Sequence, residues 1–341
     1  GLAKWQRTTD RMIRQESLAG RHIRALRYAP GANALWIGTR DAGVFRLDVA
    51  TGQTTRFSHD PTQPSSLVDD RIYALTLDQQ GRLWVGTDGG LDRLDPAASG
   101  FVHFGADPAD SRSLSDVKVR AILQDDSGTL WVGTAAGGLN RLDPGRKGFE
   151  RYRHQPESPT SLANDTVRAI LQDANGRLWV GTYQGLDLFD PVHGTFAHYR
   201  QDPKNAASLA DDHVLSLAQD RGGVLWVGTR LGGAHKWNPL SWQFGLVAAD
   251  PGNPKALGSG HVTSFSEDRA GRLWVGTFDA GLYVMERTTG EMTAYRHDRR
   301  NPRSIASDQV MALHRDHRGY LWVGTLDAGL VTGQLREHIS V

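Results

Sequence analysis

In this chain of 341 residues, the types and spacing of five basic side chains indicate a binding site. Arg24, Arg71, Lys118, Arg120 and Arg168 stand in four consecutive copies of a repeated pattern. Arginines that converge in a funnel of low dielectric constant favour an anion, because a guanidinium group can bind a carboxylate or sulfate through two hydrogen bonds. We therefore expect a site for a small anion, such as an acidic or sulfated saccharide.

The other candidate ligand-binding residues occupy the same kinds of slot in other copies of the pattern. One slot lies just before the first expected strand of a copy or two residues later, and another follows the sequence LWVGT. The residue type in these slots varies from copy to copy, whereas the surrounding Trp and Gly residues stay the same. An asymmetric binding site on a regular scaffold requires such variation. The further candidates at this rim are Tyr73, Tyr183, His213, Arg230, His261 and Phe278.

The sequence offers little support for catalysis, a metal or a cofactor. It has no cysteine, no G-x-S-x-G turn, no H-E-x-x-H pair and no P-loop. His22, His213 and His261 share a rim slot, but they come from copies one, five and six, and the channel is too wide for copy one to join the others at one ion, so we expect no metal site and no cofactor. A lyase or glycosidase could use His213 or His261 as a general base. Because no acid/base pair stands out, we expect a protein without enzymatic activity.

Composition argues against two further classes of protein. The chain has 39 basic and 38 acidic residues and a formal net charge of +1. Non-specific nucleic-acid binding requires a basic face, so a nucleic-acid partner is not expected. No run of about 18 apolar residues is present, and we therefore expect no membrane contact within these residues.

The elements that position the rim residues come from an internal repeat. Each period contains four short alternating segments, for example 166–172, 178–182, 186–190 and 196–200, which predict four antiparallel strands. The second strand is LWVGT, which reads as a buried strand ending on a Gly where the chain turns. Its tryptophans are 47 or 48 residues apart: Trp36 (in the variant LWIGT), Trp84, Trp131, Trp179, Trp226, Trp274 and Trp322.

Seven copies of a four-stranded unit predict an all-β, seven-bladed β-propeller. A ring buries every blade face against a neighbour, with the repeated Trp between adjacent blades. We expect a single domain over residues 1–330, with 1–17 supplying the outer strands of the closing blade, so that both chain ends seal the ring. Residues 329–335 compete with 2–6 for the third strand of that blade. Residues 331–341 are expected to form a tail or a linker.

Several repeated residues are expected to be structural rather than functional. The Asp of Asp-x-x-Gly-x-Leu-Trp provides one carboxylate, whereas a calcium loop needs several, so we interpret it as a turn. Outer-strand aromatic residues and three histidines also recur in register, which favours packing roles. The residues concerned are Asp78, Asp125, Asp173, Asp220, Asp268 and Asp316, then Phe104, Tyr152, Tyr199 and Tyr295, and then His59, His154 and His297.

The full pattern S-L-x-x-D-x-V-x-A-L-x-x-D-x-x-G-x-L-W-V-G-T-x-x-G-L-x-R-L-D closely resembles the two-component regulator propeller repeat, over essentially the whole chain. In that family such propellers are periplasmic sensor regions of bacterial membrane receptors. An immunoglobulin-like segment, a transmembrane helix and a histidine kinase or diguanylate cyclase follow them. The resemblance thus implies a periplasmic sensor propeller, with the following receptor domains as partners.

We therefore expect a non-catalytic ligand-sensing propeller of a signal-transduction receptor, with a small anionic or saccharide ligand at the channel rim. The alternative is a platform for protein–protein interaction, including a homodimer. The lyase or glycosidase is the second alternative.

Overall fold

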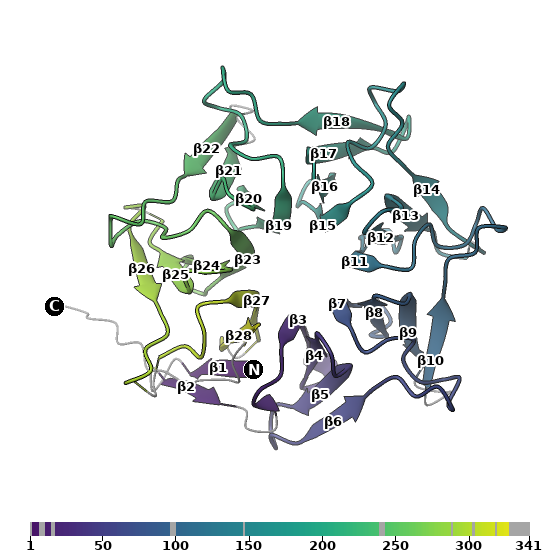
Figure 1. The fold of residues 1–341 in the computed structure, drawn as a ribbon, viewed down its shortest axis with the longest axis horizontal. Coiled ribbons are helices and arrows are strands. Elements are labelled where there is room, and N and C mark those ends of the chain that lie inside the picture. The colour runs from purple at the N-terminus through teal and green to yellow at the C-terminus, as the bar shows by residue number, and fades with distance from the viewer. Residues whose placement is uncertain are drawn as a thin grey trace.

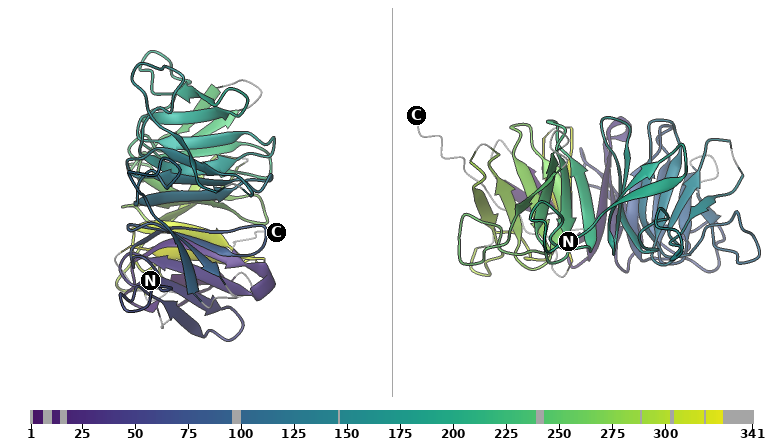
Figure 2. Two further views of the ribbon diagram at one scale, coloured as in Figure 1. Left: turned by 90° about the vertical axis from the view of Figure 1, so that its right-hand side faces the viewer. Right: turned by 90° about the horizontal axis from the view of Figure 1, so that it is seen from above.

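The computed structural model describes residues 2–6, 11–14, 18–95, 100–145, 147–238, 243–287, 289–301, 304–317 and 319–326. Seven four-stranded antiparallel sheets surround a central axis (Figure 1). Seen from the edge, the ring is a flattened disc (Figure 2). In each sheet one strand faces the axis and the remaining three follow outward.

Six of the sheets are each built from one contiguous segment of the chain. The first three are β3 (Ile23–Ala29), β4 (Ala34–Thr39), β5 (Val44–Asp48) and β6 (Thr54–Phe57); β7 (Ile72–Leu77), β8 (Leu83–Thr87), β9 (Leu91–Asp95) and β10 (Gly100–Phe104); and β11 (Val119–Gln124), β12 (Leu130–Thr134), β13 (Leu139–Leu142) and β14 (Glu150–Tyr152). The next three are β15 (Val167–Gln172), β16 (Leu178–Thr182), β17 (Gly185–Asp190) and β18 (Thr195–Tyr199); β19 (Val214–Gln219), β20 (Leu225–Thr229), β21 (Ala234–Asn238) and β22 (Gln243–Val247); and β23 (Val262–Glu267), β24 (Leu273–Thr277), β25 (Leu282–Met285) and β26 (Met292–Tyr295). One short 3₁₀ turn, η2 (Pro30–Ala32), joins β3 to β4.

The remaining sheet is shared between the two ends of the chain, in the order β2-β1-β28-β27. It combines β27 (Val310–Arg315) and β28 (Leu321–Thr325) with β1 (Leu2–Gln6) and β2 (Arg11–Arg14). The predicted fold needs one correction: six blades, not seven, are whole repeats built from one contiguous segment, while the remaining sheet is composite, as the expected closure by both chain ends requires. The physical reason is that, among the described residues, β27 and β28, the last two strands, pair with β1 and β2 from the first residues of the chain and not with a following segment.

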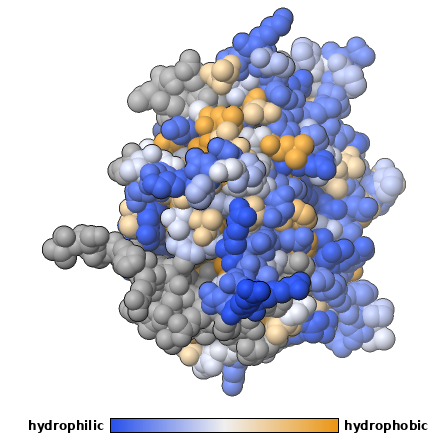
Figure 3. Space-filling model, turned by 60° about the vertical axis from the view of Figure 1, so that its left-hand side comes forward, coloured by the Kyte–Doolittle hydropathy of each residue, from blue (hydrophilic) through white to orange (hydrophobic). Residues whose placement is uncertain are grey.

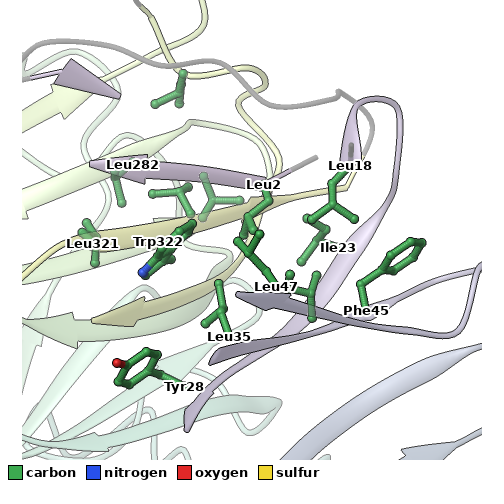
Figure 4. Packing of buried hydrophobic residues seen from close by; sticks show 14 of the residues in the cluster. Leu2, Leu18, Ile23, Tyr28, Leu35, Phe45, Leu47, Leu282, Leu321 and Trp322 are labelled. Carbon is green, nitrogen blue, oxygen red and sulfur yellow. The ribbon is translucent and has the colours of Figure 1, made fainter. Parts of the chain in front are cut away.

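β1 is the third strand of the closing blade, beside β28. The sequence offers two candidates for this strand, residues 2–6 and 329–335. Leu2 of β1 is fully buried and packs in one cluster with Ile23, Leu35 and Trp322 (Figure 4). This cluster joins the shared sheet to the first contiguous blade. The competing segment 329–335 and the expected tail 331–341 lie outside the described residues.

The Gly of LWVGT has a different role from the turn that the sequence suggested. It lies within the second strand of each blade, where a Cβ atom would come 2.5–2.8 Å from the first Val or Ile of the neighbouring inner strand. Gly181 meets Val214 in this way, and Gly324 meets Ile23, which closes the ring. The absence of a side chain thus lets adjacent blades approach closely.

The repeated Trp packs between adjacent blades, as predicted. Trp179, which is fully buried, contacts Val214 and Leu225 of the following blade. The six predicted turn aspartates each accept a hydrogen bond from the indole Nε1 of the Trp six residues later, at 2.7–3.3 Å. Outer-strand aromatics pack on the same rings, as Tyr199 does on Trp179. The interpretation of these residues as framework is confirmed.

The three repeated histidines are also structural. The Nδ1 atoms of His59, His154 and His297 lie 2.7–2.9 Å from backbone carbonyl oxygens eight residues further along the chain, in the polar loop that follows. These bonds tie the loop between two blades to the end of an outer strand.

In the described part of the chain, no helix has the length and apolar character needed to cross a membrane. Figure 3 shows one side of the ring, where hydrophilic residues cover most of the described surface and hydrophobic residues gather in small patches.

Candidate functional site at the mouth of the channel

A cavity of about 780 Å³ lies at one mouth of the central channel. Every inner strand contributes one residue to its lining, and the loops around the mouth supply most of the others. The strand residues are Arg24, Tyr73, Arg120, Arg168, Leu215, Thr263 and Met311, and the others are Arg40, Ala135, Thr166, Tyr183, Arg230, His261, Phe278 and Leu326.

A β-bulge positions all seven strand residues. In each blade the register between the inner strand and its partner shifts by one residue, for example between Val167 and Ala169 of β15. The residue skipped in the pairing, Arg168 in this blade, is the one that lines the cavity. A bulge redirects a side chain and increases the local twist. The framework therefore presents one variable side chain per blade to the channel.

Tyr73 lies between two arginines from the neighbouring inner strands. The Cζ atom of Arg24 is 4.3 Å from the centre of the Tyr73 ring, and that of Arg120 is 3.6 Å from it. Cation–π attraction holds both guanidinium groups in place and separates the two positive charges. Burial alone would raise the pKa of the Tyr73 hydroxyl, but hydrogen bonding and the positive charges of Arg24 and Arg120 outweigh it and lower this pKa.

Arg120 also forms an ion pair with Asp88, which lies just outside the cavity lining. Its Nη2 is 3.1 Å from Asp88 Oδ1, while Asp88 Oδ2 is 3.1 Å from Arg71 Nη1. Arg71 additionally pairs with Asp69 at 3.0 Å. Asp88 thus anchors Arg120 from outside the cavity, and Arg71 supports this contact without lining the site.

Arg168 is a buried cation of the lining with two further arginines near it. Burial is the largest of the effects that lower the pKa of its guanidinium group, and the nearby charges of Arg120 and Arg24 lower it further. Within the described residues, Arg168 Nε, Arg24 Nη1 and Arg120 Nη1 are buried atoms without a hydrogen-bond partner. Buried donors are normally paired, so these three indicate a place for an acceptor that comes from outside the chain.

Another part of the mouth is aromatic and apolar. The rings of His261 and Phe278 are stacked, with centroids 4.7 Å apart and an interplanar angle of 20°. Burial lowers the pKa of His261, and the charges of Arg230 and Arg168 add to this effect although Asp279 opposes it. Met311 and Leu326 also line the cavity, as apolar side chains.

The structure brings eight of the eleven predicted site residues together in this lining. The other three, Arg71, Lys118 and His213, lie outside it. His213 Nδ1 is 3.3 Å from Asp211, and its ring packs on Tyr183. Sequence reasoning had placed these three in the slot before the inner strand, whereas the bulge residue lies two residues further on.

The selection from the sequence also omitted seven lining residues, of which six are neither charged nor aromatic and the seventh is Arg40. The sequence did offer a signal for three of them, Leu215, Thr263 and Met311. They stand at the same position of the repeat as Arg120 and Arg168, two residues after the first slot. The omitted residues are Arg40, Ala135, Thr166, Leu215, Thr263, Met311 and Leu326. Among the described residues, no group of three or more His, Asp or Glu side chains could hold a metal ion.

A second cavity, of about 850 Å³, lies between the second and third contiguous blades. Residues of the repeated framework line much of it, including Trp84 and Leu130. Arg93 in this lining stacks over the rings of Trp84 and Phe104, at 5.4 and 5.9 Å. Within the described part of the chain, Arg93 Nε is also a buried atom without a hydrogen-bond partner, but the channel mouth collects three arginines with such atoms, so the mouth is the better candidate for an anion site.

The ring of four-stranded blades and its repeated turn define the chain as a β-propeller. The family model described as two component regulator propeller matches six segments: 66–89, 113–136, 161–184, 208–230, 256–279 and 304–327. The chain belongs to the two-component regulator propeller repeat family. The first copy of the repeat, which lacks the turn aspartate, is not among the matched segments.

Solved structures with a similar fold include receptor domains and an enzyme. One, described as the extracellular domain of the putative hybrid two component system BT4673 from B. thetaiotaomicron, is 23% identical with a TM-score of 0.72, over 94% of this chain and 39% of that one. The corresponding domain of BT3049 from the same organism is 22% identical with a TM-score of 0.56, over 92% of this chain and 46% of that one. This chain thus spans less than half the length of either.

Virginiamycin B lyase from Staphylococcus aureus is 12% identical with a TM-score of 0.65, over 96% of this chain and 99% of the lyase. At these identities the likeness shows the fold alone. None of the curated protein sequences matches this chain.

Proposed function

We propose that this propeller is a non-catalytic sensor region of a bacterial signalling receptor, exposed outside the cytoplasm, and that it binds a small anion at the channel mouth. One observation carries the proposal: five arginines line the cavity, and none of its described lining residues is an Asp or Glu. Such a cavity attracts negative charge, and it binds a carboxylate or sulfate through charge-assisted hydrogen bonds.

The family and the solved structures support the sensor part of the proposal. The repeat is that of two-component regulator propellers, and two similar folds are described as extracellular domains of hybrid two-component systems. Binding at the mouth touches the inner strands of all seven sheets, so a ligand would act on every blade at once.

No reaction is assigned to the site. His261 is the histidine of the lining, and burial lowers its pKa. Its ring is stacked on Phe278 rather than paired with an acid. The fold of the lyase is shared, but a shared propeller fold does not carry an activity.

Calorimetric titration with sulfate and with D-galacturonate tests the proposal. We expect both anions to bind the parent chain, and we expect Arg168→Met and Arg24→Met to weaken binding by about tenfold or more, because each removes a charged donor. Lys118→Met is the matched control, since it removes a positive charge two residues from Arg120 but outside the cavity. Absence of binding, or equal losses in the control and the Arg168 variant, would refute the anion site.

A further inference from the structure

We propose that the anion recognised at the channel mouth carries a flat apolar body, so that the ligand class is an aromatic carboxylate rather than a sugar acid. This inference rests on the proposed anion site and specifies its ligand. It follows from how the side chains are distributed around the ring.

The cationic and the apolar side chains of the inner strands occupy different arcs of the mouth. The bulge residues of β3, β11 and β15 are all arginines, with Tyr73 of β7 stacked between the first two. On the remaining arc of the ring, the bulge residues of β19 and β27 are Leu215 and Met311 (Figure 1). A ligand that spans the mouth therefore meets the three inner-strand arginines at one end, and at the other end mainly apolar surface with Arg230 on a loop beside it.

The apolar arc also offers a flat surface for stacking. Phe278 and His261 are stacked at an angle of 20°, and Leu326 adds apolar surface to the same lining. Aromatic rings favour offset stacking on such a surface, which adds to the burial of apolar area. With a volume of about 780 Å³, the cavity has room for a bicyclic ring and its carboxylate.

A sugar acid gains less from this arc than an aromatic ring does, because its hydroxyl groups need polar partners and find few among the described side chains there, chiefly Arg230, His261 and the Thr263 oxygen. Thr263 is the bulge residue of β23, and its hydroxyl lies 2.7 Å from the carbonyl oxygen of Val310 and 3.0 Å from that of Gly276. Its hydrogen is therefore already used within the ring. A hydroxyl group buried without a hydrogen bond loses affinity, whereas an aromatic ring has no such demand.

The orientation of the ligand follows from the unpaired donors. The carboxylate faces Arg168, whose Nε lacks a partner, and the similarly unpaired Nη1 atoms of Arg24 and Arg120. The stack on Tyr73 holds two of these groups before the ligand arrives. Such pre-organisation reduces the entropy lost on binding. The ring of the ligand then lies against Phe278 and Met311.

The test compares 2-naphthoate with D-galacturonate and inorganic sulfate by calorimetry on the parent chain. We expect 2-naphthoate to bind at least about tenfold more tightly than D-galacturonate, as burial of an aromatic ring implies. Phe278→Ala should weaken 2-naphthoate binding by about tenfold, and by clearly more than it weakens sulfate binding. Leu231→Ala is the matched control, because Leu231 is 77% exposed on a rim loop outside the cavity lining.

Circular dichroism verifies that each variant is folded, and Met311→Gln replaces Phe278→Ala if the latter is not. D-galacturonate binding as tightly as 2-naphthoate, or Phe278→Ala and Met311→Gln both leaving 2-naphthoate binding unchanged, overturns the aromatic ligand while the anion site stands. Failure of all three anions to bind refutes the anion site and this inference together.

Discussion

The two ends of strand β15 each carry a charged side chain, but one has all its hydrogen-bond partners within the blade and the other does not. Directly after the strand, Asp173 accepts hydrogen bonds from the backbone N–H groups of Asn175 and Arg177, from Arg177 Nε and from the indole of Trp179, all at 2.7–3.0 Å. Near its start, Arg168 lines the channel cavity with a buried donor unpaired. The first arrangement recurs from blade to blade and stabilises the fold, whereas the second varies and is costly without a ligand.

The hydrogen bonding of the polar groups therefore distinguishes structural residues such as Asp173 from candidate binding residues such as Arg168. A repeated site that pairs all its own donors and acceptors gains nothing from an outside molecule. A site that collects like charges gains when a counter-charge arrives, and proteins accept a loss of stability for such sites. Substitutions at the two ends of the blades should therefore have effects of different size and sign.

Trp179→Ala should produce the largest loss. The ring is fully buried between two blades, and truncation of such a side chain costs about 3–5 kcal/mol of unfolding free energy. Chemical denaturation measures this loss. Val192→Ala is a suitable control, because that side chain is 82% exposed. A loss no greater than that of the control would contradict the blade packing described here.

Asp173→Ala should cost about 2–3 kcal/mol, because it leaves the buried indole N–H of Trp179 without its acceptor. Burial alone would raise the pKa of Asp173, but its hydrogen bonds, first that from Trp179, lower it. The carboxylate therefore stabilises the fold above the unfolded-state pKa of about 4, and this contribution disappears as the pH falls further.

The difference in unfolding free energy between the parent and Asp173→Ala should accordingly be unchanged from about pH 7 to about pH 5 and shrink from there to about pH 3, as the pH approaches the lowered pKa of the folded state. Asp126→Ala serves as the control, since this aspartate lies in the equivalent turn of the preceding blade with an exposed side chain. A difference that stays constant over this range would argue against an ionised Asp173 in the folded state.

Gly181→Ala should destabilise the ring by about 1–3 kcal/mol through overpacking. The added Cβ would lie 2.6 Å from Cγ1 of Val214 in the next blade. The double variant with Val214→Ala should recover part of the loss measured by thermal unfolding. Gly31→Ala, where a Cβ meets nothing within 4 Å, should be nearly neutral. If both glycine variants behave alike, the close approach of blades is not what limits this position.

Lys118→Met should have the smallest effect at the mouth, within about 0.5 kcal/mol of the parent. Lys118 is an exposed side chain outside the cavity lining. Denaturant titration at low and high salt checks the value. A larger loss would mean that charges around the whole rim, and not only those in the cavity, contribute to stability.

The residues that repeat in every copy could be interpreted well from the sequence. In a closed ring of similar blades, a residue at the same position of each copy has the same surroundings in each blade. The spacing of Trp84, Trp131 and the other tryptophans predicts the four-stranded blades and the packing between them. The prediction that the Gly of LWVGT forms a turn is wrong. A turn and a close approach between blades both favour glycine, so a single sequence does not distinguish them. Only the neighbouring strand, with Val214 opposite Gly181, distinguishes the two.

The site was predicted less completely because a β-bulge is a property of two paired strands. An alternating pattern such as TVRAILQ at 166–172 gives no sign that Arg168 is skipped in the pairing. Choosing residues by chemical type then favoured Arg71 and Lys118, which lie outside the lining, and omitted Leu215 and Met311, which lie within it. The apolar arc of the mouth was missed by this choice, although Leu215 and Met311 stand in the same slot of the repeat as Arg120 and Arg168.

The most direct test of the account is paired chemical unfolding of the parent chain and Arg168→Met, each with and without 2-naphthoate at about ten times its dissociation constant. Without ligand we expect the variant to be as stable as the parent or more stable by up to about 1 kcal/mol, because a like charge is removed. With ligand, the parent should gain about 1.4 kcal/mol and the variant much less. A loss above about 1.5 kcal/mol in the variant without ligand would show that Arg168 belongs to the framework, and would contradict the account.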